Sequence, residues 1–332
     1  MMRVLRTLGM VLFIVLLCVI LAGMWTWWSV YGDRSHPAQS TQVVIQRGST
    51  FSDIAHQLAD AGVIGNATAF RLLARTEHAD VDVHAGAFRF PAHQSASDVL
   101  HSLLTGGAQV ATWVTIPEGF TAKQIAQRLG ADGIGDASTF ERSFLSTPLD
   151  VDGTKTKNLE GFLFPSTYLV PLDATPVQIE KQLTDEFFKE LPADAQARAK
   201  ALHVTVPQGV VVASLIEREA KIDADRPMIA GVIYNRLRLN MPLQVDATIE
   251  YALPEHKTEL SFADLKIDSP YNTYLHAGLP PTPIANPGRA SLEAAFHPAA
   301  TDSLYYVYCG NGHHVFAKTL SEHQANVARC LH

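Results

Sequence analysis

The segment Val210-Val-Val-Ala-Ser-Leu-Ile-Glu-Arg-Glu-Ala220 sets charged side chains into an otherwise apolar, helix-forming run. Just before it, Thr205-x-Pro207-Gln208 has the pattern of a capping box with proline in the first turn, so a helix is predicted to begin there. An ionised carboxylate in a buried helix is costly unless it is paired or its pKa is raised. A raised pKa is what a general acid needs, so we predict that Glu217 is the catalytic residue.

The surroundings of Glu217 on this helix leave a second interpretation open. Small side chains and one lysine lie beside it at helical spacing, namely Ala213, Ser214, Ala220 and Lys221. Glu219 lies about 200° further around the helix axis, so the two carboxylates are not expected to share a face. The alternative is that Glu217 does no chemistry and is paired with a nearby basic side chain, Arg218, Lys221 or Arg236.

The N-terminal stretch predicts a membrane anchor. Residues 8–28 are apolar apart from glycines and Thr26, about the 20 residues that span a bilayer. Three tryptophans at its far end, Trp25, Trp27 and Trp28, are typical of an interfacial belt, and Arg3 and Arg6 stand on the near side. We therefore predict a single-pass anchor in a bacterial inner membrane, over residues 1–34, with the N-terminus in the cytoplasm and the catalytic domain in the periplasm.

A cleaved signal peptide and a lipid-modified cysteine are the rival interpretations of this stretch. A signal peptide has a shorter apolar core and a small-x-small cleavage site, and Ile20-Leu-Ala22-Gly23 fits that pattern poorly. Cys18 follows Leu17 rather than a small residue, which disfavours lipid modification. An uncleaved anchor remains the favoured interpretation.

The net charge argues against a nucleic-acid-binding protein, and the length predicts the number of domains. The net charge is −7, and the N-terminal Arg3, Arg6, Asp33 and Arg34 contribute +2 of it, which leaves the exported part near −9. Such a chain has no basic field for nucleic acid. Hydrophobic residues make up 47% of the chain, and the roughly 300 exported residues predict about two domains with packed cores.

An internal repeat organises the first part of the exported chain. Val44-Ile-Gln-Arg-Gly48, followed by an Ile-Ala-x-x-Leu pattern, recurs as Thr115-Ile-Pro-Glu-Gly119 with a constant offset of 71 residues. Each copy predicts a strand, a glycine turn and an amphipathic helix. The pattern over residues 41–64 resembles LysM, a small glycan-binding module. We expect an α+β fold with a linker and LysM-like domain over 35–110, and a catalytic domain over 111–332 that contains the second copy at about 111–170.

The catalytic domain is predicted to be mixed α+β. Residues 176–202 read as solvated helix, Asp225 begins a helix that runs to Leu237, and Asp246 is placed to cap a short helix through Tyr251. Residues 269–287 are rich in Pro, Gly and Asn and predict a long functional loop. Strands over 303–309 and 314–318 with a turn at Gly310-Asn-Gly312 predict a C-terminal β-hairpin, and a last helix includes 322–329.

The sequence from Glu160 to the C-terminus resembles the YceG-like family, the endolytic murein transglycosylases of the MltG type. The blocks that carry the resemblance stand in family order: Glu160-Gly-Phe-Leu-Phe-Pro165, Thr167-Tyr168, Ala213–Ala220, Val232-Ile-Tyr-Asn-Arg-Leu237, Met241-Pro-Leu-Gln-Val-Asp246, Thr248, Tyr251, Ser269-Pro-Tyr-Asn-Thr-Tyr274, Gly278-Leu-Pro-Pro281, Pro283-Ile-Ala-Asn-Pro287 and Glu322-His323. Ser166 and Ala247 depart from the family pattern, where Asp and Pro are common. With the anchor and the LysM-like region, the resemblance covers nearly the whole chain.

The resemblance implies a lytic transglycosylase that cuts nascent peptidoglycan strands internally, with Glu217 as its acid. A glycoside hydrolase needs two carboxylates. A lytic transglycosylase needs one, because the 6-hydroxyl of N-acetylmuramic acid attacks and the same glutamate then accepts its proton. The product ends in a 1,6-anhydro ring. This chemistry requires burial to raise the pKa of Glu217.

Further site residues are expected by analogy with the family. Side chains predicted to hold the sugars are Gln244, Asp246, Tyr271, Asn272, Tyr274 and Ser214; those predicted to support the site are Glu160, Tyr168, Glu219, Asn235, Arg236 and Thr248. Loop packing is the alternative for the two tyrosines, an Asx turn for Asn272, and bracing of the helix pair for Asn235 and Arg236. No cofactor is expected, and the spacing of His313, His314 and His323 makes no convincing metal site.

The sequence leaves two rival functions open. One is a muramidase-type hydrolase that uses Asp246 or Glu219 as its second carboxylate. The other is a non-catalytic glycan-binding scaffold that works through the LysM-like unit. The resemblance also implies peptidoglycan synthases and the elongation machinery as partners, although the sequence contains no docking motif.

The two exported cysteines offer a further prediction. Cys309 and Cys330 are the only thiols outside the anchor, and they can pair in an oxidising compartment. The alternative is two unrelated buried thiols. We predict a disulfide that joins the C-terminal helix to the strand ending at Cys309, which requires the two Cα atoms to lie within about 7 Å.

Overall fold

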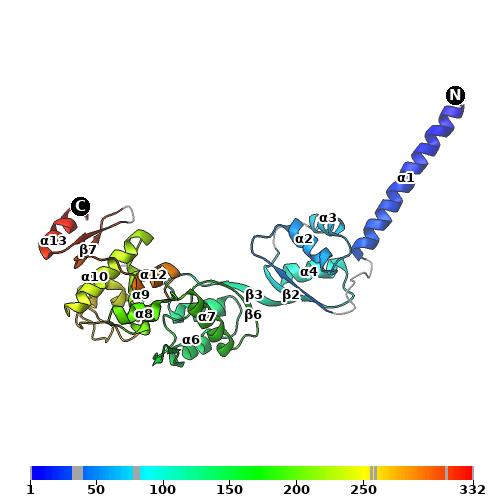
Figure 1. The fold of residues 1–332 in the computed structure, drawn as a ribbon. Helices are drawn as coiled ribbons and strands as arrows, with labels where there is room; N and C mark the ends of the chain where they lie inside the picture. Colours follow the sequence, from blue (N-terminus) through cyan, green and yellow to red (C-terminus); the bar gives the residue numbers. More distant parts are fainter. Residues whose placement is uncertain are drawn as a thin grey trace. The chain divides into compact units, whose positions relative to one another are not determined.

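The computed structural model describes residues 2–31, 40–77, 83–254, 257, 260–310 and 313–330, and the side chains of the first helix over 10–25. The chain is α+β, as predicted, and folds as two compact units (Figure 1). The first unit comprises residues 1–113 and 169–173, and the second comprises 114–168 and 174–332.

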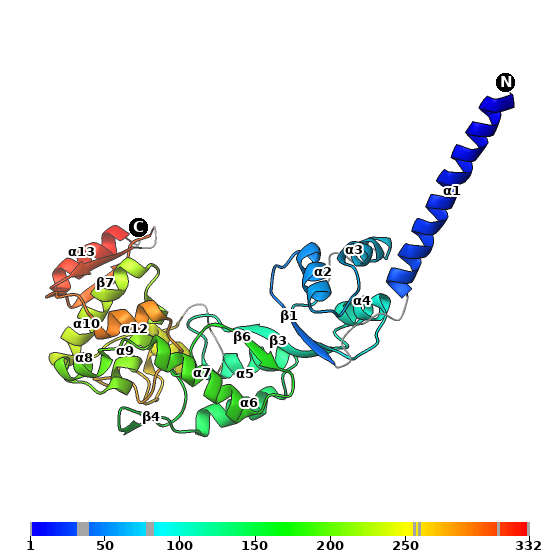
Figure 2. The same cartoon turned by 45° about the vertical axis from the view of Figure 1, so that its right-hand side comes forward.

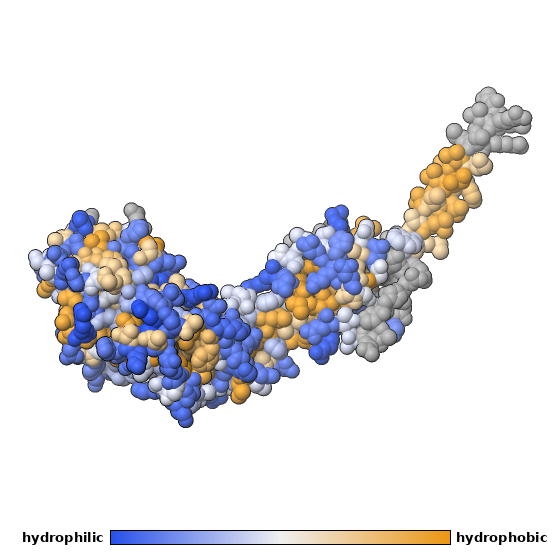
Figure 3. Space-filling model, viewed as in Figure 1, coloured by the Kyte–Doolittle hydropathy of each residue, from blue (hydrophilic) through white to orange (hydrophobic). Residues whose placement is uncertain are grey.

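The first helix, α1 (Met2–Tyr31), is apolar and exposed along its described side chains from Met10 to Trp25 (Figure 3). No single helix within the described ranges is both long and apolar enough to cross a membrane; α8 and α9 reach that length and composition only as a pair bent by 88°. The predicted linker and the side chains of Arg3, Arg6, Trp27 and Trp28 lie outside the described part of the chain.

The first unit is built on three antiparallel strands with helices between them. Its elements are β1 (Thr41–Ile45), α2 (Phe51–Asp60), α3 (Ala67–Thr76), β2 (Gly86–Phe90), α4 (Ala96–Thr105) and β3 (Gln109–Thr115). The sheet order is β1-β2-β3-β6, and β1 pairs with β2 from Thr41 opposite Phe90 to Ile45 opposite Gly86. Leu58, Phe70 and Phe88 form part of its buried core.

The second copy of the repeat has the same order of elements. It consists of β3, α5 (Ala122–Ala131), α6 (Ala137–Ser146) and β6 (Thr167–Pro171), with the short strands β4 (Asp150–Val151) and β5 (Thr154–Lys155) inserted before β6. Gly48 and Gly119 both turn the chain with positive φ, 80° and 78°, which explains glycine at both positions. The likeness of residues 41–64 to LysM stays a prediction.

The remaining elements of the second unit include four helices that contact α9. These elements are α7 (Pro176–Glu190), α8 (Ala195–Ala201), α9 (Val206–Glu219), α10 (Arg226–Arg238), α11 (Asp246–Ala252), α12 (Arg289–Phe296), β7 (Tyr305–Tyr308), β8 (His314–Ala317) and α13 (Leu320–Cys330), with single turns at Asp223–Asp225 and Asp264–Lys266. Helix α9 contacts α8, α10 and α12 (Figure 2), and it also contacts α11. A Cβ at Gly209 would lie 2.6 Å from the ring of Phe296, so the absence of a side chain lets α12 approach.

Local signals place most of these elements correctly. Thr205 caps α9 through the predicted capping box with Gln208, and 269–287 contains no regular element. The helical stretch 176–202 is divided in two, because Pro192 follows the end of α7. Asp246 does not cap α11; it is the first helical residue, and its carboxylate accepts a hydrogen bond from Tyr274 instead.

The predicted disulfide is confirmed. Cys309 and Cys330 are bonded, with their Cα atoms 4.4 Å apart. The bond joins the chain just after β7 to the last turn of α13, and β7 pairs with β8 in antiparallel register from Tyr305 opposite Ala317. Residues 311–312 of the predicted turn lie outside the described part. The disulfide thereby fixes the hairpin and its helix to one another, and three residues of β7 line a cavity with the end of α9.

Candidate active site

A cavity of about 420 Å³ lies at the C-terminal end of α9, and we call it the Glu219 pocket. Its charged and polar lining comes from the end of α9 and the segment after it, α10, the 241–246 segment, the 269–287 loop, the hairpin and α13: Arg218, Glu219, Lys221, Arg236, Gln244, Asp246, Tyr274, Tyr306, Tyr308, His314 and His323. The pocket therefore brings together, around one glutamate, segments that lie up to about a hundred residues apart in the sequence.

The Glu219 carboxyl has the properties of a general acid. Burial raises its pKa to about 7, and the negative charge of Asp246 acts in the same direction. The hydroxyl of Tyr306 donates to Oε2 at 2.9 Å and opposes the shift, because that hydrogen bond favours the ionised form. A carboxyl with a pKa about 7 holds a proton in a large fraction of molecules at neutral pH and can also accept one.

Three of the predicted sugar-binding residues share this pocket. Gln244, Asp246 and Tyr274 all line it, and the Tyr274 hydroxyl donates to Asp246 Oδ1. Gln244 has a φ of 52°, an uncommon conformation for a residue other than glycine, and its backbone N–H donates to Thr273 O at 3.1 Å. Such strained residues cluster at ligand sites, so this outlier supports a binding role for the segment.

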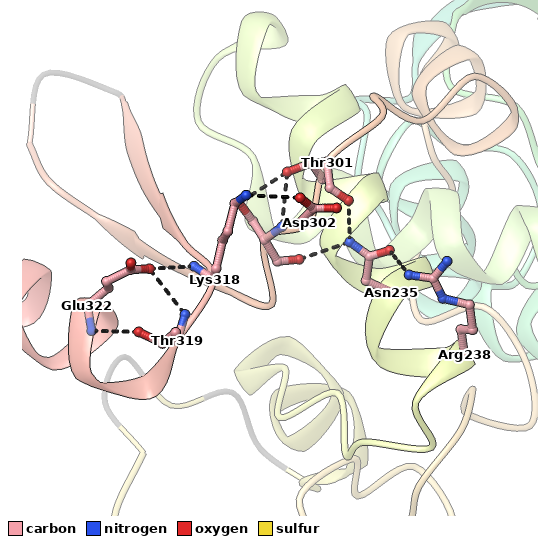
Figure 4. A network of polar contacts seen from close by, with 8 residues as sticks. Asn235, Arg238, Thr301, Asp302, Lys318, Thr319 and Glu322 are labelled. Atoms are coloured by element: carbon pink, nitrogen blue, oxygen red, sulfur yellow. Dashed lines mark hydrogen bonds and ion pairs between the residues drawn. The ribbon is translucent and has the colours of Figure 1, made fainter.

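Arg236 and Asn235 support the pocket from α10. The buried Arg236 guanidinium donates to the carbonyls of Leu304 and Leu243 at 2.6 and 2.8 Å, and so holds the start of the hairpin beside the 241–246 segment. Asn235 donates to the carbonyls of Thr301 and Ser303 at 2.8 and 3.0 Å (Figure 4). Both residues therefore brace the backbone that carries the pocket lining.

Glu217 lies in a different environment from Glu219. Its Oε2 accepts the backbone N–H of Gly288 at 3.0 Å and lies 3.4 Å from Arg226 Nη1, and its side chain is 7% exposed. Glu217 is not among the residues that line the Glu219 pocket. Arg226 also pairs with Asp223 at 3.0 Å. The sequence-based alternative was right that Glu217 has an ionic partner but wrong about which one, since the partner is Arg226.

Two residues predicted to bind sugar, Ser214 and Asn272, are internal to the fold, and a third, Tyr271, is half-buried. Ser214 is fully buried; its hydroxyl donates to Val211 O at 2.7 Å and accepts the Ile284 N–H at 3.1 Å. Asn272 is also fully buried and holds a turn, as its alternative interpretation had it. The Tyr271 hydroxyl pairs with Thr282 at 2.7 Å, which makes this side chain part of the loop packing. Burial disfavours direct contact of Ser214 and Asn272 with sugar, and sequence could not show it because it gives residue type but not exposure. A sugar-binding role for Tyr271 stays a prediction.

Glu160 and Asn286 form a buried network behind the site. Both oxygens of Glu160 accept the Ala122 N–H, and Asn286 Nδ2 donates to Oε1 at 3.0 Å. Burial raises the pKa of Glu160 to about 7, against the effect of these donors and of the Tyr251 hydroxyl. The network connects α5, the 160–163 segment and the loop that precedes Gly288.

The two remaining supporting residues are structural. The Thr248 hydroxyl is buried and donates to Val245 O at 2.7 Å, which fixes the first turn of α11 beside Asp246. The Tyr168 hydroxyl donates to Phe164 O at 2.7 Å. Neither lines the Glu219 pocket.

Sequence reasoning missed Tyr306, Arg226 and Glu118. Tyr306 belongs to an aromatic strand, Tyr305-Tyr-Val-Tyr308, and only strand placement shows which ring reaches Glu219. Glu118 follows β3 and lies against Gly288; burial and the charge of Glu217 raise its pKa. The 71-residue repeat marked the Thr115–Gly119 turn but gave no reason to single out its glutamate.

Comparison with known proteins places this geometry in a family. The YceG-like family matches residues 43–329. The chain belongs to the YceG-like family. This YceG-like chain is 36% identical over 302 residues to a Bacillus subtilis (strain 168) protein named endolytic murein transglycosylase, covering 86% of this chain and 83% of that protein.

Two further relatives extend the comparison. A Streptococcus pneumoniae serotype 2 (strain D39) protein of the same name is 30% identical over 95% of this YceG-like chain, which spans 64% of that longer protein. The crystal structure of a YceG-like protein from Listeria monocytogenes superposes with a TM-score of 0.59 at 32% identity, covering 87% of this chain and 99% of that one.

Proposed function

We propose that this chain is an endolytic peptidoglycan lytic transglycosylase and that Glu219 is its acid and then its base. The observation that carries the proposal is a carboxyl with a pKa about 7 in one pocket with Gln244, Asp246 and Tyr274. The names of the relatives, endolytic murein transglycosylase, support the reaction class.

The proposed reaction conserves atoms without water. Glu219 gives its proton to the oxygen between N-acetylmuramic acid and N-acetylglucosamine, and the bond from C1 of muramic acid to that oxygen breaks. The 6-hydroxyl of the same muramic acid then bonds to C1, and its proton passes to the Glu219 carboxylate. The enzyme returns to its starting state, and the product ends in a 1,6-anhydro ring. One carboxyl suffices because it serves in both steps.

Glu219 is a better proposal for this role than Glu217. The Glu217 carboxylate accepts the Gly288 N–H and pairs with Arg226, and it lies outside the pocket. A general acid must reach the glycosidic oxygen, and Glu219 is the glutamate that lines the pocket. The proposal therefore moves the chemistry two residues along α9 from the sequence-based prediction.

A muramidase-type hydrolase is the second candidate, because Asp246 lines the same pocket as Glu219. There, one carboxylate protonates the leaving oxygen, and the other acts as nucleophile or activates water. Mass analysis of the ends released from purified glycan strands separates the candidates. Anhydro ends support the lytic reaction, and reducing ends support the hydrolase. Strands that remain intact support a non-catalytic scaffold that only binds glycan.

The proposed acid predicts the pH dependence of cleavage. The protonated fraction of Glu219 falls as pH rises through about 7, so kcat/KM for strand cleavage should fall above that pH. Tyr306→Phe removes a hydrogen bond that favours the carboxylate, and the pKa should rise. The falling limb of the pH profile should therefore move to higher pH, whereas Tyr305→Phe, in the same strand but outside the pocket lining, should leave it in place. A limb that moves to lower pH in Tyr306→Phe would contradict the assignment.

We also propose that the apolar part of α1 anchors the chain in the inner membrane, with its N-terminus cytoplasmic and the catalytic unit periplasmic. Exposed apolar side chains from Met10 to Trp25 support this. Peptidoglycan synthases and the elongation machinery are the partners proposed, since a tether holds the enzyme where new strands emerge.

Deleting residues 1–34 tests the anchor. The shortened, exported chain should be soluble and should cleave purified strands at the full-length rate, because the Glu219 pocket uses no residue before Arg218. It should fail to complement loss of the full-length protein in cells, because the local enzyme concentration at the membrane falls. Full complementation by the soluble form would show that the anchor is dispensable.

A further inference from the structure

A second cavity, of about 430 Å³, adjoins the Glu219 pocket, and we call it the α5–α11 pocket. Arg218 lines both cavities. Helix α11 also contributes to both, since Asp246 faces the Glu219 pocket and the next residue, Ala247, lines the second cavity. The two cavities therefore meet at the C-terminal end of α9 and the first turn of α11.

The lining of the α5–α11 pocket combines apolar and polar groups in the way that a sugar requires. Its side chains include Lys123 and Gln127 from α5, Glu141 and Leu145 from α6, and Tyr251 from α11. Leu145 is 40% exposed and gives the cavity an apolar side chain that a sugar ring can cover. Lysine, glutamine and glutamate provide donors and acceptors for hydroxyl and N-acetyl groups.

Charges of both signs line the cavity. Lys123 and Arg218 face Glu141, Glu250 and Glu160, and burial raises the pKa of Glu160 to about 7. A mixed lining of this kind has no strong field of one sign for a polyanion or a polycation. A strand of N-acetylated sugars, which carries only the lactyl group of each N-acetylmuramic acid as a charged substituent, fits it better.

The boundary between the two cavities is movable. Arg218 pairs with Glu250 at 3.0 Å, and the two side chains are 35% and 26% exposed. An ion pair this open to solvent contributes about 1 kcal/mol or less, so rotation of Arg218 is inexpensive. A strand that occupied both cavities would require Arg218 to turn aside, which needs no change in the fold.

We propose that the α5–α11 pocket is a subsite that binds the glycan strand on one side of the bond cut at Glu219. The inference rests on the proposed function and deepens it. An enzyme that cuts within a strand must hold sugars on both sides of the bond, whereas the Glu219 pocket alone has room for only a short piece. The subsite makes cleavage dependent on strand length.

Filling the subsite tests the proposal. Leu145→Trp and Gln127→Trp place indole rings in the α5–α11 pocket from exposed helix positions, and Ser146→Trp adds the same ring outside the pocket lining as the matched control. Initial rates are measured on purified strands with increasing numbers of disaccharides. We expect kcat/KM on long strands to fall about tenfold, the loss of about 1.4 kcal/mol of binding, with the shortest cleaved strand unaffected.

Two results would overturn the subsite. One is an unchanged dependence on strand length in both pocket variants; the other is an equal loss on every length, which would indicate general damage. Titration of long strands into Glu219→Gln protein, with and without Leu145→Trp, measures binding separately. If the wild-type protein releases no anhydro ends, the proposed function fails, and this titration still decides whether the subsite binds glycan.

Discussion

Glu219→Gln should abolish strand cleavage while the protein remains folded. Glutamine has nearly the same shape and its carbonyl can still accept the Tyr306 hydroxyl, but it has no proton to give to the glycosidic oxygen. General acid–base catalysis contributes about 10²- to 10⁴-fold, and one residue here serves in both steps, so we expect kcat to fall by about 10³-fold or more. The measurement is the rate at which anhydro ends appear, with thermal unfolding to show that the fold is retained.

Glu217→Gln is the matched comparison, two residues away on the same helix. Glutamine still accepts the Gly288 N–H, but it removes the negative charge that faces the buried Arg226 guanidinium. Removing one partner of a buried pair lowers the free energy of unfolding, by about 3 kcal/mol in typical cases. Activity per folded molecule should stay within about tenfold of wild type. The opposite pattern, a dead but stable Glu217→Gln and an active Glu219→Gln, would restore the sequence-based assignment.

Asn286→Ala should cause the largest loss of stability. The fully buried side chain donates to Phe120 O at 2.9 Å and to Glu160 Oε1 at 3.0 Å, and it accepts the Leu163 N–H at 2.8 Å. Alanine leaves these groups without a partner in the interior, and each unsatisfied buried group costs about 1–3 kcal/mol. We expect the free energy of unfolding, measured by urea denaturation, to fall by about 3–5 kcal/mol.

Asn235→Ala is the reference variant against which the loss of unfolding free energy in Asn286→Ala is compared. Its side chain also donates to two carbonyls, but it is only partly buried, so water can replace it, and the loss should be about 1 kcal/mol. Equal losses in the two variants would show that the Glu160–Asn286 network contributes no more than an ordinary pair of hydrogen bonds.

Sequence alone predicted what depends on neighbours along the chain. The capping box at Thr205 and Gln208 fixed the start of α9, because cap and partner are three residues apart. The 71-residue repeat predicted two similar strand–turn–helix units, since each glycine turn is a local requirement. The Cys309–Cys330 bond followed from compartment and elimination rather than from any long-range pattern.

Tertiary structure decided what depends on exposure and on distant partners. Glu217 and Glu219 are nearly equivalent in sequence, yet one accepts from Gly288 and faces Arg226, while the other meets Tyr306 and Asp246. Ser214 and Asn272 have the chemistry of sugar ligands but are sealed inside the fold. The physical reason is that a carboxyl's pKa and reach depend on burial and on charges brought from remote segments. Those segments are adjacent only after the loop, the hairpin and α10 have packed around the end of α9.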